Sequence, residues 1–155
     1  MTPEQFASHL AQMQLDFKDY VNDILPEILA NEAVLMFKEN FQDESFFGEK
    51  WQEVQRRNAG TKTYKYATQA DRNRKILTGR TGNLGRSIKV KEVGNGTATI
   101  ISDLPYSDAH NSGTTTAGRG RGTTIAQRKF IGDHPKLQQA LTDIINDEID
   151  RIINS

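Results

Sequence analysis

The segment 87–102 reads Ser87-Ile88-Lys89-Val90-Lys91-Glu92-Val93-Gly94-Asn95-Gly96-Thr97-Ala98-Thr99-Ile100-Ile101-Ser102. Polar and apolar residues alternate along 87–93 and again at the start of 97–102, which is typical of half-buried strands. The Gly-Asn-Gly sequence between them tolerates the positive φ angles of a tight turn. The segment therefore predicts an antiparallel β-hairpin with one buried face.

A long helical region is predicted before this hairpin. Thr2, Pro3 and Gln5 form a good helix start, with a capping box and a proline in the first turn. Pro26 lacks a backbone donor and should end or kink the helix. Apolar residues recur at helical spacing on both sides of it: Phe6, Leu10, Met13, Phe17 and Ile24, then Leu25, Leu29, Ala33, Met36, Phe37 and Phe41. We expect two helices or one kinked helix over 3–41, with this stripe in the core.

The region after the hairpin predicts a loop and a final helix. Residues 111–124 are rich in Gly, Thr and Arg and have no apolar anchor, which indicates a long, flexible loop. Residues 135–153 carry an apolar stripe of Leu and Ile at helical spacing, which indicates an amphipathic C-terminal helix packed across the sheet. Together these elements predict a single α+β domain over 1–155, with a helical region at 1–41 and an α+β core at 76–155.

The composition excludes several classes of protein. Of the 155 residues, 35% are hydrophobic and 26% charged, and there is no cysteine, so disulfides and thiolate metal sites are excluded. No apolar run reaches the roughly 20 residues of a membrane-spanning helix. We therefore expect no membrane partner.

The net charge of zero conceals an uneven distribution. Residues 1–55 carry a net charge of −8, residues 56–91 carry +10, and residues 92–155 carry −2. Such a division can steer association with a partner or with another copy. The basic segment 56–91, in which Tyr64 and Tyr66 lie among lysines and arginines, could equally bind nucleic acid. A solvated helix beside a basic loop would give the same pattern.

The familiar catalytic and ligand-binding motifs are missing. The glycines around Gly79 and Gly118 have neither the P-loop ending nor the spacing of a dinucleotide fold. No Gly-x-Ser-x-Gly elbow is present. The residues Asp103, Asp108, His110 and His134 have no metal-ligand spacing and are better explained as polar groups at strand ends and a helix cap. We expect no catalytic site, cofactor or metal. A small enzyme ranks third among the hypotheses, after a structural protein and a nucleic-acid-binding module.

Five short motifs follow one another in the order of a known family. They are Gly48-Glu49-Lys50-Trp51, Ile76-Leu77-Thr78, Thr81-Gly82-Asn83-Leu84-Gly85-Arg86-Ser87-Ile88, Tyr106-Ser107-Asp108-Ala109-His110-Asn111-Ser112-Gly113, and Ala126-Gln127-Arg128-Lys129-Phe130-Ile131-Gly132. In this order, residues 45–153 resemble the phage virion morphogenesis family, the tail-completion proteins of Mu-like and P2-like phages. Ser107 stands where the family has Ala, and the usual Pro before the Arg-x-Phe segment is absent.

The resemblance implies a structural, non-enzymatic phage or prophage protein at the head–tail junction. It implies completion of the tail or joining of the tail to the head, by a ring that is expected to be a hexamer. The expected partners are other tail or connector proteins, with DNA close by in the lumen. The expected locations are the virion and, during assembly, the cytoplasm of the bacterial host. The alternative is a nucleic-acid-binding module that uses segment 56–91 with Arg119 and Arg121.

Two sets of residues are predicted to carry this role. Contacts with a neighbouring subunit or partner are expected from Arg72, Arg74, Lys75, Arg119 and Arg121. Structural positions are expected at Trp51, Gly82, Leu84, Ser87, Tyr106, His110, Gly113, Phe130 and Gly132. Gly82 should give a tight entry into the hairpin and Phe130 should anchor the loop in the core. Tyr106 should pack on the sheet with a wet hydroxyl, and Asp133 should cap the last helix.

Overall fold

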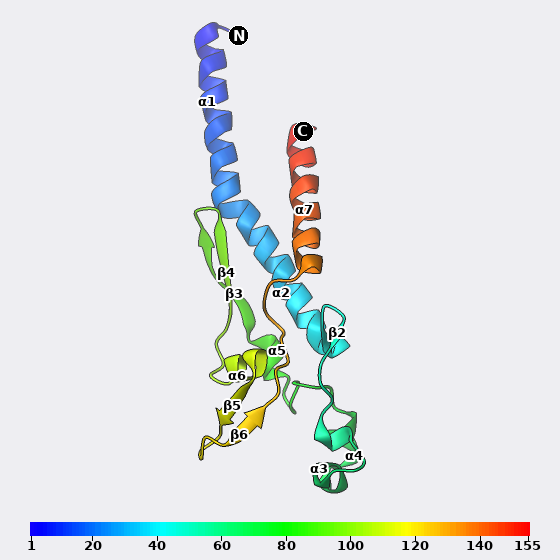
Figure 1. Ribbon diagram of the computed structural model, residues 1–155. Coiled ribbons are helices and arrows are strands. Elements are labelled where there is room, and N and C mark those ends of the chain that lie inside the picture. Colours follow the sequence, from blue (N-terminus) through cyan, green and yellow to red (C-terminus); the bar gives the residue numbers. More distant parts are fainter.

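A computed structural model describes residues 1–155, and its α+β architecture confirms the predicted fold class (Figure 1). Helix α1 (Pro3–Asp19), the π-helical turn η1 (Tyr20–Ile24) and helix α2 (Leu25–Asp43) follow one another without a break. The predicted capping box of Thr2 and Gln5 begins α1. The single bent helix was one of the two predicted alternatives.

Pro26 explains the bend. In an α-helix, the carbonyl of residue 22 would accept a hydrogen bond from the N–H of residue 26, and proline has no N–H. The chain widens to a π-helical turn at this point. The free Asn22 carbonyl accepts a hydrogen bond from the Gly96 N–H at 3.0 Å instead. The tip of the predicted hairpin is thereby attached to the bend in the helix.

Helix α2 forms the centre of the molecule. On one side lies the predicted hairpin, made of β3 (Ile88–Gly94) and β4 (Thr97–Ser102), paired antiparallel with Ile88 opposite Ser102. A bulge lies between Val90 and Glu92. The alternation predicted over 87–93 therefore does not hold throughout, because the polar residues Lys91 and Glu92 follow one another. On another side lies helix α7 (Pro135–Ile153) (Figure 1). The expectation that α7 crosses the sheet was wrong, because its apolar stripe packs on α2.

The hydrophobic core gathers around the second half of α2. The Phe41 ring lies 5.5 Å from the Trp51 ring and 5.2 Å from the Phe130 ring, between centroids. The Trp51 indole N–H donates to the Lys129 carbonyl at 2.8 Å. The core cluster comprises Ala33, Val34, Phe37, Phe41, Trp51, Ile76, Leu84, Ile88, Phe130 and Leu137. It joins segments that lie far apart in the sequence.

The basic segment forms a small lobe beyond the end of α2. The two-stranded ribbon of β1 (Ser45–Phe46) and β2 (Glu49–Lys50) precedes three short helices: η2 (Gln55–Arg57), α3 (Lys62–Tyr66) and α4 (Gln69–Asn73). Glu44 holds this lobe, because its carboxylate accepts hydrogen bonds from the Arg57 guanidinium and from the Ile76 N–H.

The Gly/Thr/Arg segment is more regular than the sequence predicted. After α5 (Asn83–Arg86) and α6 (Ser107–Ser112), strands β5 (Thr114–Ala117) and β6 (Thr123–Ile125) pair as a hairpin. Part of the predicted flexible loop over 111–124 is therefore a hairpin. Gly118, at φ +80°, and Arg121, at φ +51°, supply the left-handed residues of its turn.

The ion pair at Glu44 should make folding sensitive to acid. The Arg57 hydrogen bonds, helped by the Ile76 N–H, lower the pKa of Glu44 from 4.5 to about 2. A carboxyl whose pKa is lowered on folding stabilises the fold above its unfolded pKa, and this contribution is lost as the pH falls from 4.5 toward 2. The shift corresponds to about 3 kcal/mol.

We expect Glu44→Gln to lower the free energy of unfolding at pH 6 by about 2–3 kcal/mol and to remove most of this acid dependence. Denaturant unfolding at pH 6 and pH 2.5 measures both quantities. Glu53→Gln is the matched control, because Glu53 is largely exposed and lies 3.5 Å from the same guanidinium. An equal loss of stability on acidification in the parent and in Glu44→Gln would contradict the prediction.

Candidate assembly surfaces

Helix α1 carries an apolar stripe that no other part of the chain covers. The helix extends beyond the rest of the molecule, and none of its residues is buried (Figure 1). The stripe consists of Phe6, Leu10, Met13 and Phe17, each of which exposes about half of its surface. The prediction that these residues lie in the core was therefore wrong. The helical periodicity of the stripe correctly predicts an apolar face, but no other part of the chain buries that face.

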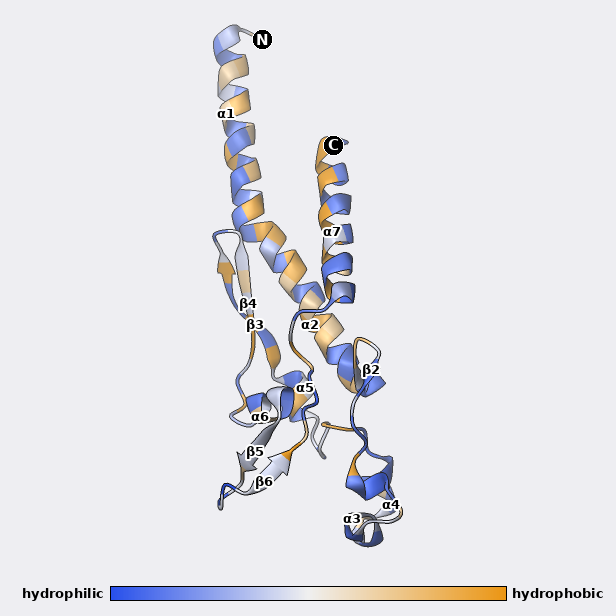
Figure 2. Ribbon diagram, viewed as in Figure 1, coloured by the Kyte–Doolittle hydropathy of each residue, from blue (hydrophilic) through white to orange (hydrophobic).

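The apolar surface continues onto the end of α7. An open cleft of about 610 Å³ separates α1 from the last turns of α7 and is lined by Met13, Phe17 and Ile152 among others. The Tyr20 hydroxyl donates a hydrogen bond across it to the Glu148 carboxylate. Figure 2 shows apolar residues along the side of α7 that faces α1 and α2. Beyond this cleft, Ile153 is 73% exposed.

A second apolar hollow lies lower down, between α2, β4 and α7. It has a volume of about 360 Å³ and includes Val21, Leu29, Ala98, Leu141 and Ile145 in its lining. Val21 follows directly on the stripe of α1. The uncovered apolar surface therefore runs from the free end of α1 to the middle of the molecule.

The charges divide along the same long axis. Residues 3–43, which form α1, η1 and α2, carry eight acidic and two basic residues, a net charge of −6. Residues 55–73, which form the lobe of η2, α3 and α4, carry five basic residues and one acidic residue, a net charge of +4. Figure 1 places α1 and this lobe at opposite ends of the molecule. The charge is therefore divided between the two ends of an elongated molecule, and such a division can steer association with a partner.

Three of the five predicted contact residues are occupied within the chain. The Arg72 guanidinium donates to the Tyr64 carbonyl at 2.8 Å and lies 4.0 Å from the centroid of the Tyr64 ring. Arg74 pairs with Asp71 at 2.8 Å, and the Lys75 ammonium donates to the Gln42 carbonyl. These residues hold the basic lobe together. Arg119 and Arg121 are exposed at the tip of the β5–β6 hairpin, where a partner can reach them.

The predicted structural positions lie mostly around one end of the core. Trp51, Leu84 and Phe130 are buried together. The Ser87 hydroxyl donates to the Leu84 carbonyl at 2.6 Å and lies 2.6 Å from the Ser102 hydroxyl, which closes the base of the hairpin. Gly82, at φ +67°, begins the single turn of α5 before β3, as a tight entry requires.

The other predicted positions lie along the chain that returns to α7. A side chain at Gly113 would bring its Cβ to 3.0 Å from the Gln127 backbone nitrogen, so the two segments can approach only at a glycine. Gly132 has φ +153° and precedes the last helix. His134, not Asp133, caps this helix, because its Nδ1 accepts the Lys136 N–H at 3.1 Å.

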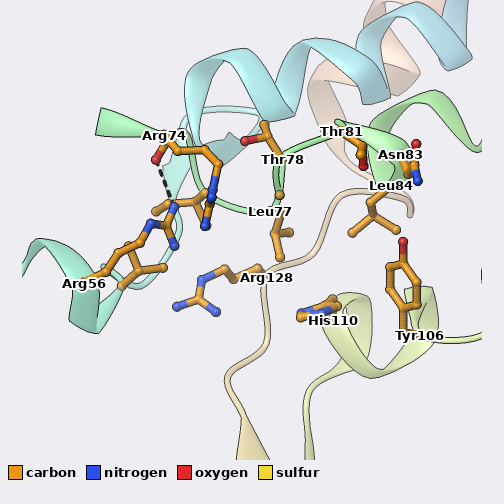
Figure 3. A pocket seen from close by; sticks show the side chains of 13 residues that line it. Arg56, Arg74, Leu77, Thr78, Thr81, Asn83, Leu84, Tyr106, His110 and Arg128 are labelled. Atoms are coloured by element: carbon orange, nitrogen blue, oxygen red, sulfur yellow. Dashed lines mark hydrogen bonds between the residues drawn. The ribbon is translucent and has the colours of Figure 1, made fainter. Parts of the chain in front are cut away.

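Asn111 attaches the returning chain, a role that the sequence did not reveal. Its side-chain oxygen accepts the N–H groups of Phe130 and Ile131 at 2.8 and 3.0 Å, and its amide donates to the Ile131 carbonyl at 3.1 Å. The Tyr106 and His110 rings, 6.2 Å apart, face a cavity of about 310 Å³ (Figure 3). Tyr106 is therefore a cavity-lining residue as well as a half-exposed one.

Three comparisons of the chain with known proteins found no significant match. No protein-family model matches it, and no curated protein and no solved structure is significantly similar to it. No helix of the structure combines the length and the apolar character that crossing a bilayer requires. The structure brings no three His, Asp or Glu side chains together as a metal site.

The mobility of the β5–β6 hairpin stays a prediction. Only its two ends are paired, Thr114 with Ile125 and Ala117 with Thr123, and the turn between them is exposed. We expect amide hydrogens of 115–124 to exchange faster than those of β3–β4 in the free protein, and to slow when a partner binds. Hydrogen-exchange mass spectrometry compares the two hairpins in one sample. Equal protection of both hairpins in the isolated chain would contradict this.

Proposed function

We propose that this chain is a structural phage or prophage protein of the head–tail junction, which completes the tail or joins it to the head as an oligomeric ring. The resemblance of residues 45–153 to tail-completion proteins supports the phage role. The uncovered apolar stripe of α1 is the observation that supports assembly. It is the largest feature of this molecule that folding of one chain leaves unsatisfied.

The size of the stripe suits contact between copies. The apolar side chains exposed along the stripe, at its continuation in η1 and at the end of α7 are Phe6, Leu10, Met13, Phe17, Ile24, Ile149 and Ile153. If about half of each is exposed, they present roughly 600 Å² of apolar surface, which is near the lower limit for one side of a stable interface. A patch of this size is at the upper end of those found on monomers, and such patches are often functional.

The charge division favours a ring over a two-fold dimer. A two-fold contact through α1 would place acidic helices against acidic helices. A heterologous contact, in which one face of each copy meets a different face of the next, can bring the acidic end close to the basic lobe. Such contacts generate rings when the rotation closes. A hexamer is the first stoichiometry to test.

The remaining parts of the proposal follow from the phage role. The partners are other tail or connector proteins, and the protein acts in the virion after assembly in the cytoplasm of the bacterial host. Arg119 and Arg121, on the exposed hairpin, are available for DNA that passes through the ring. The role requires no chemistry, so no residue is assigned a catalytic function.

Two leucines of α1 provide a matched test of assembly. Leu10 lies on the stripe, and Leu15 lies on the opposite side of the helix, with 48% and 54% of their surfaces exposed. Because burial of a leucine contributes about 1.5–3 kcal/mol, Leu10→Gln should weaken self-association at least about tenfold. Leu15→Gln should change it less than about twofold. Sedimentation velocity over a dilution series measures both variants.

The same samples also test the charge contribution. Raising the salt from 0.1 to 1 M shortens the Debye length from about 10 to 3 Å and should dissociate the oligomer in part. Thermal unfolding controls for folding, because neither leucine is buried. Equal effects of the two substitutions, or a monomer at every concentration even with tail partners present, would argue against the proposal.

A nucleic-acid-binding module remains the second candidate, favoured by the exposed part of the basic lobe. Tyr66 is 79% exposed, and the Lys65 ammonium lies 5.9 Å from its ring centroid. Such a pair can stack on a single-stranded base. Lys62 is also exposed nearby.

Binding to a single-stranded oligonucleotide distinguishes the two candidates. We expect weak binding that falls steeply with salt and is reduced by Arg119→Ala with Arg121→Ala. These residues are better targets than Arg72 and Arg74, whose hydrogen bonds hold the lobe together. Fluorescence anisotropy at 50 and 150 mM salt gives the affinities. Tight binding at 150 mM salt that survives Leu10→Gln would place the nucleic-acid role first.

A further inference from the structure

A cationic cavity lies between the basic lobe and the returning chain. Its volume is about 310 Å³, which is large enough to admit a side chain (Figure 3). Arg56 and Arg74 line it from the lobe, and Arg128 and His110 line it from the returning chain and α6. Its apolar lining comes from Val54, Ile76, Leu77 and Leu84. The cavity is distinct from the apolar stripe of α1.

Two of its arginines have no carboxylate partner. The Arg56 guanidinium donates to the carbonyls of Asp71 and Arg74 at 2.7 and 2.9 Å, and Arg128 donates to the Gln52 carbonyl at 3.0 Å. Neither forms a salt bridge. Carbonyls fix the orientation of a guanidinium without pairing its charge. The Glu53 carboxylate acts on the charge of both arginines but forms a salt bridge with neither.

His110 adds an unsatisfied polar atom to the same cavity. Its Nδ1 is buried and has no hydrogen-bond partner within the chain. Burial, with the nearby Arg128 cation, lowers the pKa of His110 below its usual 6.5. A buried polar atom without a partner is uncommon, and this one belongs to a residue that lines the same cavity as the two guanidiniums without a salt bridge.

We propose that this cavity binds the carboxylate of an Asp or Glu side chain on a partner protein. A carboxylate would compensate Arg56 and Arg128 together, while the apolar lining would accommodate the methylene groups that carry it. A duplex backbone would instead need cations spread over an open surface. This proposal does not depend on the proposed ring, since an acidic segment of any partner protein could bind in the cavity.

A short acidic peptide tests the proposal. The probe is triglutamate with acetyl and amide ends, and its triglutamine analogue is the uncharged control. In NMR spectra of the isotope-labelled full chain, triglutamate should shift the side-chain signals of His110 and Arg128, and triglutamine should not. Inorganic phosphate and a thymidine dodecamer complete the set of ligands.

Three variants assign the binding to this cavity. Arg128→Gln should weaken triglutamate binding at least about tenfold, and Thr81→Glu should do the same by placing a negative charge at the exposed edge of the cavity. Arg119→Gln, on the hairpin tip, should change it less than about twofold. Thr81→Glu removes no hydrogen bond of the fold, so it keeps the test valid if Arg128→Gln unfolds.

Several outcomes would overturn the assignment. Absence of shifts at His110 and Arg128, or equal losses in Arg119→Gln and Thr81→Glu, would show that the peptide binds elsewhere or only through general charge. Tighter binding of phosphate than of triglutamate would assign a small-anion site. Tighter binding of the dodecamer, with the same variant pattern, would assign the cavity to nucleic acid.

Discussion

The packing of Phe41 against Trp51 and Phe130 is the contact on which the rest of the structure depends. It brings together the end of α2, the ribbon that follows it, and the chain that returns to α7. Hydrogen bonds from Trp51 to Lys129 and between Asn111 and Phe130 then fix the orientation of these segments. Because only 15 of the 155 residues are buried, this small cluster must hold most of the fold. Nothing comparable packs on α1, none of whose residues is buried.

Local patterns predicted the elements well, since each depends on residues close in sequence. The alternation around Gly94-Asn95-Gly96 predicted β3 and β4, and the capping box and Pro26 predicted the start and the bend of the long helix. The β5–β6 hairpin escaped prediction because its strands are made of threonines without apolar anchors. The position of α7 on α2 was not predicted, because the apolar stripe of α7 shows which face is apolar but does not identify the element that covers it. The same reason explains the error on α1.

The candidate sites were harder to predict, since they depend on residues that are distant in sequence. Arg56 and Arg128 are separated by 71 intervening residues, and no spacing rule connects them. Arg72, Arg74 and Lys75 were predicted to contact a partner, but they interact within the chain with Tyr64, Asp71 and Gln42, respectively. A count of charge by segment can locate a basic lobe. It cannot separate the cations that build the lobe from those that remain for a partner.

The hydrogen bond from Gly96 to the Asn22 carbonyl gives the bend at Pro26 a mechanical meaning. Helix α1 projects from the molecule, and the tip of the β3–β4 hairpin contacts the long helix where it bends. A force on the free end of α1 would be transmitted through this hydrogen bond into β3 and β4, and from there to Ile88, which is buried in the core. Pro26 therefore couples the direction of α1 to the rest of the molecule. In an unbroken α-helix, the Asn22 carbonyl would be occupied and could not bind the tip of the hairpin.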